Sequence, residues 1–180
     1  MEFNTIEEIF AAIDKTRGKL VNTAAVLTEN DANFQSAPEK WSAAHLVEHL
    51  AKTEESLLTL IEKLLAKAEA ENVPATGRIE PPVSFAEIAE KAKGQKFTAP
   101  DAIKPEGAST ITNSLARLEK SRASLKALQP RLEKVDLSNA KFPHPAFGPL
   151  NLYYWLAFIG LHEARHLAQI SNCLEALPKN

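Results

Sequence analysis

Apolar side chains recur every three or four residues along four separate stretches of this chain. This period places them on one face of a helix, whereas no stretch shows the sustained alternation of apolar and polar residues that is typical of a strand. The pattern therefore predicts an all-α protein, a four-helix bundle in which each helix buries its apolar face against the others. The first expected helix covers about residues 5–30, the second begins at Ser42, the third covers about 109–129 and the fourth begins near Pro149.

Local signals mark where these helices begin and end. Thr5 and Glu8 have the spacing of a capping box, in which each side chain accepts a hydrogen bond from the backbone N–H of the other residue. Serine is favoured as an N-cap, as at Ser42, and proline fits the first position of a helix, as at Pro149. Pro130 is expected to stop the third helix, because a proline inside a helix removes one hydrogen bond and clashes with the preceding turn.

A long connection separates the second expected helix from the third. This crossover covers about residues 72–105 and contains five prolines, and a short helix is expected within it over residues 84–93. A connection of this length lets the second and third helices run parallel, whereas the two shorter loops suit closer connections. We therefore expect an up-down-down-up bundle.

Length and composition bound the class of protein. With 180 residues, 44% of them hydrophobic, the chain can bury one core and is too short to favour two, so residues 1–180 are expected to form a single domain. The formal net charge of -2 comes from 21 basic and 23 acidic residues scattered along the chain. Without a basic stripe to bind phosphates, a nucleic-acid partner is not expected.

Three further observations indicate a cytoplasmic protein. Cys173 is the only cysteine, so no internal disulfide can form. The first ten residues include three acidic side chains and lack a long apolar run, which argues against a signal peptide. No stretch is apolar enough to cross a bilayer, so no membrane partner is expected.

Three histidines give the strongest functional signal. His162 and His166 are four residues apart, so they lie on one face of the fourth helix, one turn from each other. His49 lies on the apolar face of the second helix, at a depth that matches theirs if these two helices are antiparallel. Three imidazoles and an open position are typical of a catalytic zinc-type site, because a structural site usually has four protein ligands. The alternative is three core or rim histidines with local hydrogen bonds.

Nearby residues are weaker candidates. His45 lies one turn before His49 and is not needed as a further ligand. His144 lies between two prolines, about 18 Å along the helix axis from His162 if the helix is straight, so a turn or rim role is expected. The sequence indicates no general base. The residues that flank the ligands point elsewhere on their helices and are expected to act only in support of the site: Glu48, Glu163 and Arg165.

The motifs around these histidines resemble those of a known family. In order along the chain, the motifs are Lys40-Trp41-Ser42, Glu48-His49-Leu50-Ala51, His144-Pro145 with Gly148, and His162 to His166 with Leu167, Gln169 and Ile170. In order and spacing they resemble the DinB superfamily, and within it the DinB/YfiT-like metalloenzymes, over nearly the whole chain. The resemblance implies a four-helix bundle whose metal ion, often nickel or zinc, is bound by one histidine of the second helix and two of the fourth. The matching positions are His49, His162 and His166.

The resemblance also implies what the site does. Relatives include enzymes that use the low-molecular-weight thiols bacillithiol or mycothiol, so we expect a metal-dependent enzyme that transfers such a thiol to a small electrophile. The alternatives are a metal-dependent hydrolase and a non-catalytic bundle stabilised by its metal ion. A homodimer is compatible with the sequence, since the family often forms dimers. The chain ends directly after its fourth helix, so the C-terminal domain of the mycothiol-dependent isomerases is not expected.

Overall fold

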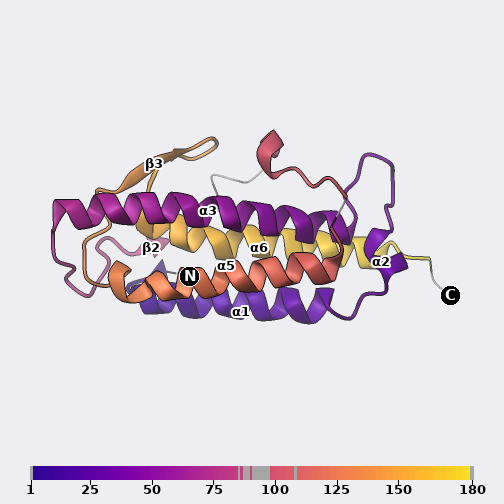
Figure 1. Cartoon of the computed structure of the whole chain (residues 1–180), viewed down its shortest axis with the longest axis horizontal. Helices are drawn as coiled ribbons and strands as arrows, with labels where there is room; N and C mark the ends of the chain where they lie inside the picture. Colours follow the sequence, from indigo (N-terminus) through magenta and orange to yellow (C-terminus); the bar gives the residue numbers. More distant parts are fainter. Residues whose placement is uncertain (1, 85, 87–89, 91–97, 108, 179–180) are drawn as a thin grey trace.

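Four long helices lie side by side in the computed structural model of this chain, which describes residues 2–84, 86, 90, 98–107 and 109–178 (Figure 1). They are α1 (Ile6–Ala24), α3 (Ala43–Glu71), α5 (Ile111–Leu132) and α6 (Leu152–Glu175). A five-residue helix, α2 (Glu29–Asn33), follows α1, and a 3₁₀ turn, η1 (Asp101–Ile103), lies near the end of the crossover. The four-helix bundle expected from the apolar periodicity is confirmed.

The helices run in the expected up-down-down-up order. The ion pairs Glu55–Arg117 and Glu69–Arg131 both join residues 62 apart in the chain, so α3 and α5 are parallel and in register along their length. Figure 1 shows α1 and α6 running in the direction opposite to α3 and α5. The crossover between α3 and α5 therefore returns the chain to the end of the bundle at which α3 began, as its length predicted.

Isoleucine and leucine side chains from all four long helices fill the interior. Each contributes about 1.5–3 kcal/mol to folding relative to an exposed position. α1 and α6 pack closely at Gly160, where a Cβ atom would lie 3.0 Å from Ile13 Cγ2. Fully buried members of this core are Ile9, Ile13, Leu20, Leu50, Ile61, Leu65, Leu118, Leu125 and Leu156.

Two small antiparallel sheets, which the sequence did not predict, accompany the helices. β1 (Glu2–Phe3) pairs with β2 (Val83–Ser84), and β3 (Lys141–His144) pairs with β4 (Gly148–Asn151) in a hairpin that leads directly into α6. Strands of two to four residues are too short to show alternation. The described chain is still mainly helical.

The beginning and the end of α1 differ in detail from the prediction. Thr5 Oγ1 accepts a hydrogen bond from the backbone N–H of Glu8 at 3.1 Å, as in a capping box. The Glu8 carboxylate, however, accepts from the backbone N–H of Asn4 rather than that of Thr5, at 2.6 Å. α1 ends at Ala24 instead of near residue 30, because Thr28 caps the separate helix α2.

The predicted boundaries at two prolines were wrong. Pro130 lies inside α5, which continues to Leu132. A proline so near the C-terminus removes one hydrogen bond from the last turn only, and the helix tolerates it. Pro149 lies in β4 instead of beginning α6, and Asn151 is the N-cap, since its Oδ1 accepts from the backbone N–H of Tyr154 at 3.1 Å.

The short helix expected over residues 84–93 falls largely outside the described residues, and Ser84 itself lies in β2. Within the described part of the chain, no helix combines the length and the apolar character that crossing a membrane requires.

Gly160 and Gly18 allow the packing of α1 against α6 to be tested. Gly160→Leu is expected to lower the free energy of unfolding by about 1–3 kcal/mol, because its side chain overlaps Ile13. Gly18→Ala, on the exposed side of α1 where a new Cβ would have no neighbour within 4 Å, is expected to raise it by about 0.5–1 kcal/mol through helix propensity. Urea denaturation followed by circular dichroism measures both, and equal effects of the two substitutions would contradict this packing.

Candidate metal centre

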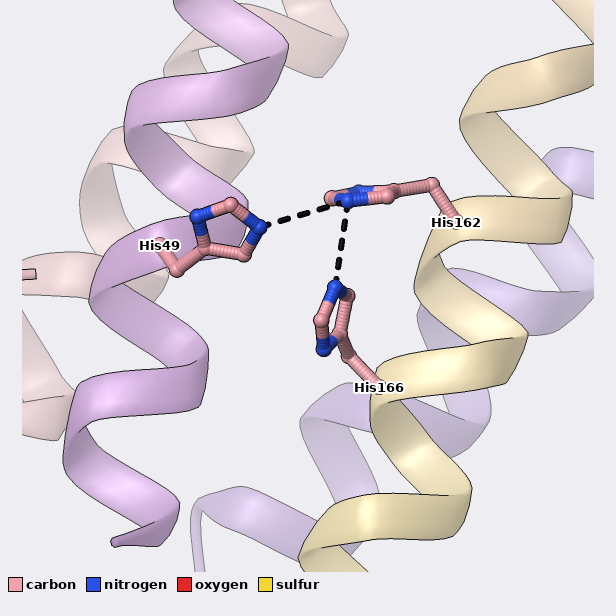
Figure 2. Close-up of side chains that lie close together, drawn as sticks. All are labelled: His49, His162 and His166. Carbon is pink, nitrogen blue, oxygen red and sulfur yellow. Dashed lines mark hydrogen bonds between the residues drawn. The ribbon is translucent and has the colours of Figure 1, made fainter. Parts of the chain in front are cut away.

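Three imidazole rings converge between α3 and α6 (Figure 2). Nε2 of His49 lies 3.3 Å from Nε2 of His162, which in turn lies 3.1 Å from Nε2 of His166. His49 and His166 are buried, and His162 is partly exposed. The structure thus brings together the three histidines singled out in the sequence, two from one turn of α6 and one from the antiparallel helix α3.

The other ring nitrogens fix the protonation of two of these histidines. Nδ1 of His49 donates to the backbone carbonyl of Ile103 at 2.8 Å, and Nδ1 of His166 donates to the side-chain oxygen of Gln169 at 2.6 Å. A neutral imidazole carries one N–H, so each of these two rings presents a lone pair at Nε2. This is the arrangement in which metal-ligating histidines are usually held.

The distances between the Nε2 atoms suit a shared metal ion better than direct hydrogen bonds. Nε2 of His162 carries at most one proton, which can point at only one of the two neighbouring lone pairs, so at least one of its two Nε2 contacts is not a normal hydrogen bond. Ligand nitrogens about 2.0–2.1 Å from a tetrahedral zinc ion lie about 3.3–3.4 Å from one another. Two of the three Nε2 pairs therefore have the separation expected for ligands of such an ion, and all three candidate ligand atoms lie within 4.8 Å of one another, so one divalent ion could accept the three lone pairs.

Burial keeps these imidazoles neutral near pH 7. It lowers the pKa of His162 well below its ordinary value, and the neighbouring His166 and His49 add to the effect. Burial also lowers the pKa of His166 to about 4 and that of His49 to a smaller extent. Neutral rings can bind a metal ion at neutral pH without first losing a proton.

The end of the crossover is anchored to α3 beside His49. The Glu48 carboxylate accepts hydrogen bonds from the backbone N–H groups of Glu106 at 3.1 Å and Gly107 at 3.0 Å. Nζ of Lys52 donates to the backbone carbonyl of Lys104 at 2.9 Å. Burial alone would raise the pKa of Glu48, but the two N–H groups and Lys52 outweigh it and lower the pKa. The crossover thus docks through an ionised carboxylate one residue before a candidate ligand.

A cluster of buried charges lies next to the histidines, with one member from each long helix: Arg17, Glu54, Arg122 and Glu163. Arg17 donates to Glu163 at 2.6 Å and also pairs with Glu54. Arg122 donates to both carboxylates, at 3.3 Å each. Since each arginine meets both glutamates, the cluster ties the four helices together at one level of the bundle.

Glu163 links this cluster to the metal centre, because it directly follows His162 in α6. It is 2% exposed, and burial raises its pKa, although Arg17 and Arg122 act in the opposite direction. Its Oε2 has no hydrogen-bond partner within the described residues. From the sequence, Glu163 was expected only to support the site, and Arg17 was not singled out. The available signal was a charge at position 17 on the otherwise apolar face of α1.

His45 caps α3 and does not join the other histidines. Its backbone N–H donates to Ser42 Oγ at 3.3 Å, which confirms Ser42 as the N-cap. Its Nδ1 lies 2.8 Å from the same hydroxyl and 3.3 Å from the Ser42 backbone nitrogen, so the ring completes a capping box.

His144 lies much closer to the site than the straight-helix estimate of about 18 Å suggested. Its ring centroid is 4.9 Å from that of Phe158, which is 5.5 Å from that of His162. The estimate was wrong because β3 and β4 fold back along α6 instead of extending its axis. A single phenyl ring therefore separates His144 from a candidate metal ligand.

A pocket of about 940 Å³ lies elsewhere, between α1, α2 and the first half of α5. Arg17 and Arg122 line it, whereas His49, His162 and His166 do not. The pocket is therefore separate from the metal centre.

Comparisons with known proteins agree with this fold. A model of the DinB superfamily matches residues 12–170. The chain belongs to the DinB superfamily. This DinB-superfamily chain is 26% identical over 154 residues to YuaE, an uncharacterized protein of Bacillus subtilis strain 168. The aligned region covers 85% of this chain and 89% of YuaE.

Two solved structures share the bundle of this DinB-superfamily protein. The four-helix bundle protein TT2238 superposes with a TM-score of 0.60 at 22% identity, over 92% of this chain and 98% of TT2238. YfiT of Bacillus subtilis, described as a probable metal-dependent hydrolase with an unusual four-helix bundle topology, superposes with a TM-score of 0.62 at 19% identity. That match covers 94% of this chain and 85% of YfiT. At these identities, the two structures support the fold.

The neighbouring residues Glu54 and Glu55 provide a matched test of the charge cluster. Glu54→Gln is expected to lower the free energy of unfolding by about 3–5 kcal/mol, because it leaves two buried arginines short of a counter-charge. Glu55→Gln breaks the surface pair with Arg117 and is expected to cost less than about 1 kcal/mol. Chemical denaturation measures both, and a Glu54 variant as stable as the Glu55 variant would show that the cluster does not hold the bundle together.

Proposed function

We propose that this protein is an enzyme dependent on a divalent metal ion, nickel or zinc, that transfers a low-molecular-weight thiol to a small electrophile. The observation that carries the proposal is that the Nε2 atoms of three histidines converge. In two of these rings, Nδ1 donates a hydrogen bond on the far side, which leaves a lone pair on Nε2. Within the described part of the chain, no fourth side chain joins this group. Three ligands leave a coordination position open, which is typical of catalytic sites.

A divalent ion in such a site supplies a Lewis acid that lowers the pKa of a thiol or of water, so that the anion is available near neutral pH. The chain itself contributes the three ligands and the groups that orient them, namely the carbonyl of Ile103 and the amide of Gln169. His162 is the one of the three whose residue is not fully buried.

Hydrolysis is the second candidate function. It is favoured by the likeness of this bundle to that of YfiT, which is described as a probable metal-dependent hydrolase. The same ligand set serves either reaction, because both require a metal ion that stabilises an anionic nucleophile. The nucleophile, a thiol or water, distinguishes the two.

Metal content provides the first test. Purified untagged protein is expected to contain about one nickel or zinc ion per chain, and His49→Ala and His162→Ala are each expected to lose it. His45→Ala is the matched control, since His45 lies one turn from His49 and caps α3 instead. Elemental analysis gives the result directly. Wild-type protein that takes up neither ion on reconstitution would exclude the metal centre.

Activity provides the second test. The metal-loaded protein is expected to consume a thiol in the presence of a small electrophile, to lose this activity on chelation and to regain it with zinc or nickel. A panel of thiols and electrophiles, with thiol loss as the readout, is compared with a panel of esters and amides without thiol. Turnover of the second panel alone would favour the hydrolase. If neither panel turns over, and His166→Ala loses the metal ion and several degrees of melting temperature but keeps its cellular role, the ion is structural.

A further inference from the structure

A continuous row of aromatic rings extends from the metal centre onto the β3–β4 hairpin. Beyond His162 and Phe158, the ring of His144 stacks on that of Phe147, with centroids 4.3 Å apart and planes inclined by 20°. Phe147 also lies edge-to-face against Phe158, with centroids 6.3 Å apart. The turn of the hairpin is thus joined to a metal ligand through ring contacts.

These rings are only partly covered. His144, Phe147 and Phe158 are each of intermediate exposure, whereas Trp155, which packs against both His144 and Phe158, is 4% exposed. The cluster therefore has a buried base, and its three partly exposed rings lie next to the candidate ligand His162. Partly exposed aromatic rings beside a polar centre are a common basis of small-molecule recognition.

The hairpin holds His144 in a fixed orientation. Its Nδ1 accepts a hydrogen bond from the backbone N–H of Ala146 at 3.1 Å, within the same turn. Burial lowers the pKa of His144, so at neutral pH the ring is an uncharged aromatic surface. A surface fixed before binding loses little conformational freedom when a ligand stacks on it.

We propose that His144, Phe147 and Phe158 form the subsite that recognises the electrophile, and that this electrophile carries a planar aromatic or conjugated group. The inference rests on the metal centre of the proposed function and adds the class of substrate. The planar group stacks on a ring of this cluster, and its reactive atom lies toward His162. Specificity then comes largely from the hairpin, which contributes two of the three rings and no ligand to the candidate centre.

The subsite can be tested on cobalt-loaded protein with acetohydroxamate and benzohydroxamate. Both probes bind a metal ion through the same two oxygen atoms, and only the second has an aromatic ring. The visible absorption of the cobalt ion reports binding of each probe. Wild-type protein is expected to bind benzohydroxamate about tenfold more tightly than acetohydroxamate, as expected for a stacked ring.

Substitutions then locate the effect. Phe158→Leu and Phe147→Leu are each expected to reduce the ratio of the two affinities towards one, with cobalt binding and acetohydroxamate affinity unchanged. Phe147 lies in the hairpin turn outside the helices, so its variant serves as the test even if Phe158→Leu fails to fold. Phe142→Leu is the matched control and should keep the wild-type ratio, because this 47% exposed ring is on the same hairpin and contacts Trp155.

The outcomes separate the two proposals. Equal affinity of wild-type protein for the two hydroxamates, with cobalt bound, would overturn the aromatic subsite and leave the metal centre intact. An equal loss of the ratio in Phe142→Leu would also overturn the subsite, since the effect would then belong to the hairpin as a whole. Failure of wild-type protein to bind cobalt would overturn the metal centre, and the subsite with it.

Discussion

The register of the bundle depends on the buried charges Arg17, Glu54, Arg122 and Glu163. An uncompensated charge in a protein interior costs several kcal/mol, and here each arginine meets both glutamates. Sliding one helix by a single turn, about 5.4 Å, would separate its charge from the others. Because His162 directly precedes Glu163, the constraint that holds α6 in place also sets the height of the histidines on α6 relative to α3.

The two sides of the metal centre are supported in different ways. His166 is oriented by Gln169, three residues further along the same helix, so helix geometry alone positions this pair. His49 is oriented by the carbonyl of Ile103, 54 residues away and outside the four long helices. Lys52 and Glu48 bind the backbone of the residues that follow Ile103, at positions 104, 106 and 107, and so help to keep this carbonyl in place. A change in the docking of the crossover therefore acts on the ligand set through His49.

The sequence predicted the features that depend on helix geometry and missed those that depend on tertiary contacts. Helical period indicated the bundle, the length of the crossover indicated its direction, and helical rise showed that the depth of His49 matches that of the histidines on the fourth helix. They could not give the contact between Arg17 and Glu163, which are 146 residues apart. The hairpin was missed because strands of four residues have too few positions to alternate, and the place of His144 was missed with it.

The bundle and its connections contribute different parts of the site. The long helices supply the candidate ligands and hold them in register, whereas the crossover and the hairpin supply the groups beside them, Ile103 on one side and Phe147 with His144 on the other. Connections tolerate change far better than packed helices. One ligand set can therefore serve different substrates in different relatives through changes in these two connections. In the proposed function, substrate choice thus resides in the hairpin and the metal chemistry in the three histidines.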